Sequence, residues 1–228
     1  MAFVKKDTTI NEYRNFVKEV YGPVNAKDYN LWDILTNMER FIMRALKGIR
    51  KKDKNKIKIN SLITLSWFMS IMNQLQIDIE NEIWKRFPYL CSYCASCPCS
   101  CKEKKVKERQ KIFIDEKKRP KTFKEFQNMF SKIYPPENRT IEHAGIHLAE
   151  ETGEFAESIL IYRGGHKKMD FDRIPREAAD LFSCLMGVFN SLGIDIAEEL
   201  SIRFSNNCHV CKNAPCTCSF EDVVRFKS

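Results

Sequence analysis

Apolar residues recur at helical spacing along most of the chain. Leu148, Phe155 and Ile159 form one stripe, and the segment 181–192 carries a second one. Because residues three, four or seven positions apart share one face of an α-helix, both segments are predicted to be amphipathic helices. No segment alternates in the manner of a half-buried strand, so the pattern predicts an all-α protein. The expected helix breaks lie at 135–136, 163–165 and 170–175.

Two predicted helix starts carry the same signal. Thr9 and Glu12 have the spacing of a capping box, and so do Thr122 and Glu125. In such a box the hydroxyl and the carboxylate accept hydrogen bonds from amides that lack a partner at the helix start. The two boxes are 113 residues apart, which is the first indication of an internal repeat.

The cysteines extend this repeat. Eight of the ten form two groups with the spacing C-x-x-C-x4-C-x-C, and the groups are 117 residues apart. The change of offset from 113 to 117 implies a four-residue insertion between Leu160 and Ile174. The predicted segments are a first repeat, 1–101, a basic linker, 102–121, and a second repeat, 122–228.

Each cysteine group supplies four thiolates at a spacing that suits one tetrahedral Zn²⁺ ion. A site closed by four protein ligands is structural, because no position remains for a water. Reduced free thiols and iron–sulfur clusters are the alternatives that the spacing leaves open. Cys97 and Cys184 lie outside the pattern. The predicted ligands are Cys91, Cys94, Cys99 and Cys101 in the first repeat, and Cys208, Cys211, Cys216 and Cys218 in the second.

Paired acidic residues in the second repeat are the strongest candidates for chemistry. Glu151 and Glu154 share a helix face, as do Glu177 and Asp180, since each pair is three residues apart. If the two helices pack antiparallel, the four carboxylates converge and require a hard cation such as Mg²⁺ or Mn²⁺. Gly153 between the first pair suggests the close approach of another group. The alternative is that both pairs face solvent.

These residues resemble the MazG-like all-α nucleotide pyrophosphohydrolases. The signature of that family is E-E-x-x-E, a spacer, and E-x-x-D, which Glu150-Glu151-x-x-Glu154 and Glu177-x-x-Asp180 match at every position. The resemblance covers about residues 122–204 and implies a helical bundle that hydrolyses (d)NTP to (d)NMP and pyrophosphate. It further implies that Glu151, Glu154, Glu177 and Asp180 hold Mg²⁺. A motif carboxylate or Glu150 would accept the proton of the attacking water.

Other polar residues could contact the nucleotide. His147 lies one helical turn before Glu151, where it could reach the base or sugar. Arg163, Lys167 and Lys168 in the inserted segment could reach the phosphates. The alternatives are a helix-packing histidine and solvated loop charges.

The first repeat lacks the acidic motif. At the repeat offsets the four proposed ligands are replaced by Met38, Phe41, Asn60 and Ile63. Since members of the family commonly dimerise, the resemblance implies an intramolecular pseudo-dimer with one active site, and further homo-oligomerisation stays open.

Charge leaves a second function open. The formal net charge is +8, and the linker holds eight Lys and two Arg against four acidic residues, a net +6. Such a run is usually a solvated connector, but it could bind nucleic acid. The alternative function is thus a non-catalytic module that senses nucleotides or binds nucleic acid. No apolar stretch has the length of a membrane span, so a cytoplasmic location is expected.

Overall fold

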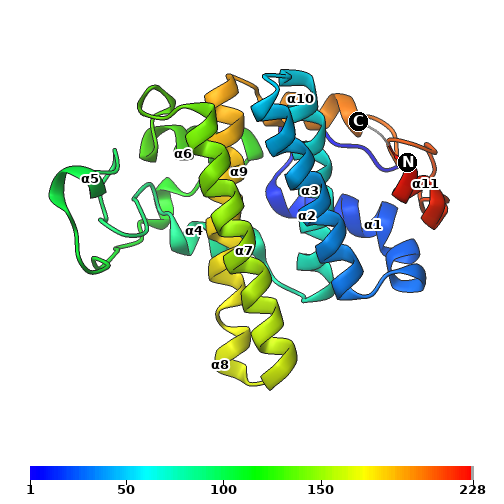
Figure 1. The fold of residues 1–228 in the computed structure, drawn as a ribbon, viewed down its shortest axis with the longest axis horizontal. Coiled ribbons are helices and arrows are strands. Elements are labelled where there is room, and N and C mark those ends of the chain that lie inside the picture. The colour runs from blue at the N-terminus through cyan, green and yellow to red at the C-terminus, as the bar shows by residue number, and fades with distance from the viewer. Residues whose placement is uncertain (227–228) are drawn as a thin grey trace. The chain divides into compact units, whose positions relative to one another are not determined.

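The computed structural model describes residues 1–226, and these residues form helices and turns with no strand. The predicted all-α class is therefore confirmed. The helices belong to two compact units, of which unit 1 comprises Met1–Asp78 and the chain from Asp195, and unit 2 comprises Ile79–Ile194. Figure 1 shows the helices of both units along the chain.

Unit 1 is built around one buried helix. Helix α3 packs against both α1 and α2, and its side chains are buried on nearly every face from Asn60 to Met72. The helices of unit 1 are α1 (Ile10–Asp28), α2 (Leu31–Arg50), α3 (Lys54–Gln74), α10 (Ile196–Arg203) and α11 (Phe220–Arg225).

Unit 2 has the same plan around α9, which packs against α4, α6 and α7. Figure 1 shows α7 and α9 running side by side. The α-helices of unit 2 are α4 (Ile79–Arg86), α5 (Cys101–Lys104), α6 (Phe123–Ile133), α7 (Ile141–Gly165), α8 (Lys168–Phe171) and α9 (Ile174–Leu192). Two short 3-10 helices complete it, η1 (Glu116–Lys118) and η2 (Pro136–Asn138).

The helix starts follow the sequence signals, with one difference. Thr9 and Glu12 form the complete capping box. The Thr122 hydroxyl accepts from the Glu125 amide as predicted, but the Glu125 carboxylate accepts from the amide of Lys121. Glu125 therefore satisfies an amide one residue before the predicted one.

The predicted helix breaks at 135–136 and within 170–175 agree with the structure, and only the break predicted at 163–165 is displaced, to 166–167. Helix α7 continues through Arg163 to Gly165, and His166 ends it in the left-handed conformation. The corresponding connection between α2 and α3 has only three residues, Lys51 to Asp53. The extra residues of the second repeat thus lengthen α7 and form the short helix α8.

The compact units divide the chain differently from the sequence repeats. The chain leaves unit 1 within Ile77-Asp78-Ile79 and returns within Ile194-Asp195-Ile196, at equivalent points of the two repeats. Helix α4 and the cysteine group of the first repeat therefore lie in unit 2, with the first helices of the second repeat. Helix α10 and the cysteine group of the second repeat lie in unit 1, with the first helices of the first repeat. The reason in unit 2 is packing, because Ile83 and Trp84 of α4 are fully buried and α4 packs on α9.

Among residues 1–226, no single helix is long and apolar enough to cross a membrane. The segments 168–192 and 196–203, which are bent relative to each other, are together long and apolar enough for a span, but only by length and composition.

Candidate metal and acidic sites

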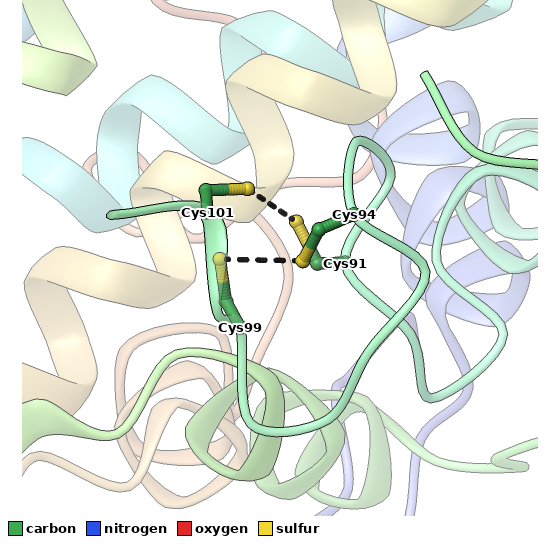
Figure 2. Close-up of side chains that lie close together, drawn as sticks. All are labelled: Cys91, Cys94, Cys99 and Cys101. Atoms are coloured by element: carbon green, nitrogen blue, oxygen red, sulfur yellow. Dashed lines mark hydrogen bonds between the residues drawn. The ribbon is translucent and has the colours of Figure 1, made fainter. Parts of the chain in front are cut away.

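The first cysteine cluster (Cys91, Cys94, Cys99 and Cys101) lies in unit 2. Figure 2 shows its four sulfur atoms pointing toward one another. The Sγ atoms of Cys91 and Cys101 are 3.7 Å apart, and those of Cys94 and Cys99 are 3.9 Å apart. Four thiolates at about 2.3 Å from one tetrahedral metal ion would be about 3.8 Å apart, whereas a disulfide would bring two sulfurs to about 2.05 Å. The cluster therefore has the dimensions of a four-thiolate metal site.

Neighbouring groups favour the thiolate form of Cys94, whereas burial raises the pKa values of Cys99 and Cys101. The amides of Tyr93 and Ser100 donate to the sulfurs of Cys91 and Cys94, at 3.5 and 3.4 Å. Burial raises the pKa of Cys94, but hydrogen bonds from Ser96 and Ser100 outweigh burial and lower that pKa to about 5. A thiolate is the form that binds metal, so Cys94 is prepared for ligation, whereas Cys99 and Cys101 would release protons when a metal binds.

The second cysteine cluster (Cys208, Cys211, Cys216 and Cys218) repeats this arrangement in unit 1. Its sulfurs are 3.9 Å apart for Cys208 and Cys218 and 3.8 Å apart for Cys211 and Cys216. The amides of Val210 and Thr217, 117 residues after Tyr93 and Ser100, donate to the corresponding sulfurs.

Each cluster is attached to the first helix of the other repeat. The Cys99 amide donates to the Ile133 carbonyl at the end of α6, and the Cys216 amide donates to the Val20 carbonyl of α1. Cys97 is exposed outside the first cluster, and Cys184 is buried within α9.

Three of the four predicted acidic ligands come together in unit 2. These three form the acidic cluster, which consists of Glu151 on α7 and of Glu177 and Asp180 on α9. One carboxylate oxygen of each residue lies within 4.8 Å of those of the other two. The side chain of Glu154 is exposed and lies outside this group. Its charge nevertheless raises the pKa values of Glu151 and Glu177, so it is close to both.

An arginine that sequence reasoning missed binds the acidic cluster. Arg86 of α4 donates Nε to one oxygen of Asp180 at 3.0 Å and Nη2 to the other at 2.5 Å. The two side chains are only 17% and 12% exposed, which makes this a largely buried bidentate ion pair. The available signal was the dipeptide Arg86-Phe87, which recurs as Arg203-Phe204 at the repeat offset.

The acidic cluster retains an excess of negative charge. Burial, followed by the charges of Asp180, Glu154 and Glu177, raises the pKa of Glu151 to about 7 although Arg86 acts in the opposite direction. Burial and the neighbouring carboxylates also raise the pKa of Glu177. The Oε2 atom of Glu151 is buried and accepts no hydrogen bond. A buried carboxylate oxygen without a partner is costly, so the site fits a proton or a cation.

The acidic cluster opens into a cavity of about 600 Å³ that lies within unit 2. Glu151 and Asp180 form part of its wall, as do His143 and His147 of α7. The Nε2 atoms of the two histidines are 3.1 Å apart, and Nδ1 of His147 is 3.1 Å from Glu150. Three cysteines of the first cluster also line this cavity. A volume of this size is typical of a small-molecule site.

The other predicted contacts lie elsewhere. Arg163, Lys167 and Lys168 are exposed and do not line the cavity. Arg163 follows Glu151 by twelve residues, which is about 18 Å along a helix. An added Cβ at Gly153 would meet no protein atom within 4 Å, so no part of the described chain is the close neighbour that the sequence suggested.

In unit 1 the positions equivalent to the acidic ligands are part of the core. Met38, Phe41, Asn60 and Ile63 are all buried. The cavity at this place is lined mostly by apolar groups and measures only about 70 Å³.

Comparisons with protein-family models, with curated proteins and with solved structures return no match. The functional argument therefore depends on the residues and the geometry of these sites.

The raised pKa of Glu151 predicts a pH-dependent stability. The folded protein holds this proton up to about pH 7, whereas the unfolded chain releases it near 4.5. The Glu151 contribution to the free energy of unfolding is thus present below pH 4.5 and is lost as the pH rises to 7. Relative to the wild type, Glu151→Gln should be more stable at pH 8 than at pH 5. Urea unfolding without added divalent cation tests this, and an equal difference at both pH values would contradict it.

Proposed function

We propose that the protein is a Mg²⁺-dependent nucleotide pyrophosphohydrolase that converts a (d)NTP to the (d)NMP and pyrophosphate. The observation that carries the proposal is the acidic cluster at the wall of the unit 2 cavity, with the buried, unpartnered Oε2 atom of Glu151. The match to the MazG-like motif supplies the reaction class.

The donor set fits a hard divalent cation, because it consists of carboxylate oxygens with excess negative charge. Glu151 and Glu177 would hold it, with Glu154 and Asp180 as the further ligands that the family resemblance implies. Asp180 is the least available of the four, since both of its oxygens are bound by Arg86. Bound there, Mg²⁺, or Mn²⁺ in its place, would neutralise phosphate charge and lower the pKa of the attacking water.

The chain's own groups would control the proton and the position of the substrate. A motif carboxylate would accept the proton of the attacking water. Because a bound cation would lower the pKa of Glu151 from its metal-free value of about 7, the base must be an oxygen that does not ligate the cation. Glu150 is exposed and bound to His147, so it is the less suitable base. His147 lies at the cavity wall, where it can contact a base or sugar.

We further propose that the two repeats arose by tandem duplication of a MazG-like bundle, with a degenerate first copy in a pseudo-dimer. In support, α4 and α10 have the same length and lie 117 residues apart. The first repeat would then contribute α4, Arg86 and one cysteine cluster to the unit that holds the acidic cluster. Zn²⁺ is the proposed metal of both cysteine clusters, since their sulfur spacing matches a tetrahedral thiolate site.

Release of pyrophosphate and nucleoside monophosphate from a panel of NTPs and dNTPs with Mg²⁺ tests the proposed activity. Glu151→Gln and Glu177→Gln should each lower turnover by about 10²-fold or more, because each removes negative charge where the cation would bind. Glu157→Gln is the matched control, since Glu157 is an exposed carboxylate on α7 outside the acidic cluster.

If the folded wild-type protein releases no pyrophosphate from any nucleotide, the proposed enzymatic activity is wrong. Nucleotide binding without turnover would then support a sensing module, a function that the bidentate hold of Arg86 on Asp180 also favours. Binding to RNA or DNA that falls steeply with salt and survives Glu151→Gln would support the nucleic-acid module instead.

A further inference from the structure

The two units contain cavities at equivalent positions. Of the residues that line the small cavity of unit 1, several recur in the large cavity of unit 2 at the repeat offsets. Examples are Tyr21 and Tyr134, Ser66 and Ser183, and Cys216 and Cys99. In both units, the chain segment that directly follows the cysteine cluster borders the cavity.

In unit 1 this following segment fills the space. After Cys218 the chain forms α11, and the ring of Phe226 packs against the rings of Phe41 and His209. Arg40 and Arg44 hold the segment by donating to its carbonyls, among them that of Phe226 at 2.8 Å. The occupant of this cavity is thus an apolar part of the chain itself.

In unit 2 the following segment is the start of the basic linker, which lines the cavity without filling it. Lys102 and Arg109 line the cavity. The segment is fixed to the cysteine loop, because the Gln110 amide donates to the Tyr93 carbonyl at 2.8 Å. The Arg109 guanidinium lies 5.6 Å from the centre of the Tyr93 ring, and its Nη1 atom donates to the Ser92 carbonyl at 3.3 Å.

Both signs of charge line this cavity, because the linker side carries Glu103 as well as basic residues, and α7 and α9 add carboxylates. Lys102, Arg109 and Arg139 line it, and none of them forms an ion pair within residues 1–226. Glu151 and Asp180 form part of the wall on α7 and α9. A ligand that satisfies both sets carries several negative charges and binds a divalent cation, which is the chemistry of a triphosphate. A cavity of about 600 Å³ holds one nucleotide, not a nucleic-acid strand.

We propose that the segment 102–110 is a phosphate-binding cover of the unit 2 cavity, in which Lys102 and Arg109, together with Arg139, bind the triphosphate of the ligand. This inference rests on the proposed function for its substrate class. It assigns the phosphate contacts to the linker and to Arg139 instead of to Arg163, Lys167 and Lys168.

The test compares two double variants that remove the same charge from the same linker. Lys102→Gln/Arg109→Gln alters residues that line the cavity, and Lys104→Gln/Lys111→Gln alters residues that do not. The first should raise the KM for nucleoside triphosphate at least about tenfold with kcat within about twofold, because charge-assisted hydrogen bonds are lost. The control should stay within about twofold of the wild type.

A second measurement separates this inference from the proposed activity. Calorimetric titration with inorganic tripolyphosphate and Mg²⁺ should show the same tenfold loss of affinity in Lys102→Gln/Arg109→Gln and in Arg139→Gln, at unchanged metal content and melting temperature. If no nucleotide is hydrolysed but tripolyphosphate binding follows this pattern, the activity fails and the phosphate-binding cover stands. If hydrolysis occurs and both double variants behave alike, the cover is wrong. The cover is also wrong if Lys102→Gln/Arg109→Gln loses RNA binding but keeps the tripolyphosphate affinity of the wild type.

Discussion

Replacing Arg86 with alanine should lower the free energy of unfolding by about 3 kcal/mol. The substitution removes the only bidentate partner of Asp180 within residues 1–226 and leaves the acidic cluster without its positive charge. Urea denaturation should report the loss, together with a fall in melting temperature of roughly 10 °C for a chain of this size. Mg²⁺ should restore part of the stability, since a cation replaces the missing charge.

Two comparisons make this result specific to the ion pair. Arg203→Ala changes the equivalent arginine of the second repeat, where the position of Asp180 is taken by Ile63, and should cost less than about 1 kcal/mol. Arg86→Ala combined with Asp180→Asn should be less destabilising than the sum of the two single changes. Equal effects of Arg86→Ala and Arg203→Ala would show that the buried pair contributes nothing beyond packing.

Removal of the thiolate-bound metal should have the largest effect on the fold. We expect two Zn²⁺ ions per chain, and binding at such sites stabilises a fold by about 10 kcal/mol or more. Cys94→Ser should release one ion and destabilise unit 2, and Cys211→Ser should release one ion and destabilise unit 1. Elemental analysis and thermal unfolding measure both effects.

Cys97→Ser is the matched control, because Cys97 lies between two ligands in sequence but outside the cluster. It should keep both ions and the melting temperature of the wild type. Iron in place of zinc would replace the zinc assignment with an iron–sulfur cluster, and an absence of bound metal would leave eight reduced thiols.

The local features of both sites were predictable. Ligands that lie within eleven residues of one another, as in C-x-x-C-x4-C-x-C, must meet when the loop folds back, so the cysteine clusters followed from spacing. The pair Glu177 and Asp180 lies three residues apart on one helix, and α-helical geometry alone places both side chains on one face. Only Glu154 of the four predicted ligands lies outside the acidic cluster.

The sequence could not place residues whose positions depend on helix length and on the surrounding elements. The sequence left open whether Arg163 reaches the phosphates or is a solvated charge. Helix α7 continues to Gly165 and carries Arg163 along its axis, away from Glu151, which favours the solvated charge. At Gly153 no protein atom would lie within 4 Å of an added Cβ, so that side of the helix is not covered by the described chain. The preference of a residue for a helix does not indicate which face of that helix another part of the chain will cover.

The sequence by itself determined the helical class, the repeat, the two thiolate clusters and the acidic pairs, because each depends on periodicity or on contacts between residues near in the chain. Only the tertiary structure decided that α4 and the first cysteine cluster join the helices of the second repeat, that Arg86 binds Asp180, and that the linker borders the cavity. The physical reason is that the burial of Ile83 and Trp84 against α9 selects a partner across about 100 residues. Both repeats contain a similar apolar helix, α3 or α9, on which α4 could pack, so the hydrophobic pattern of the sequence does not show which of the two it selects.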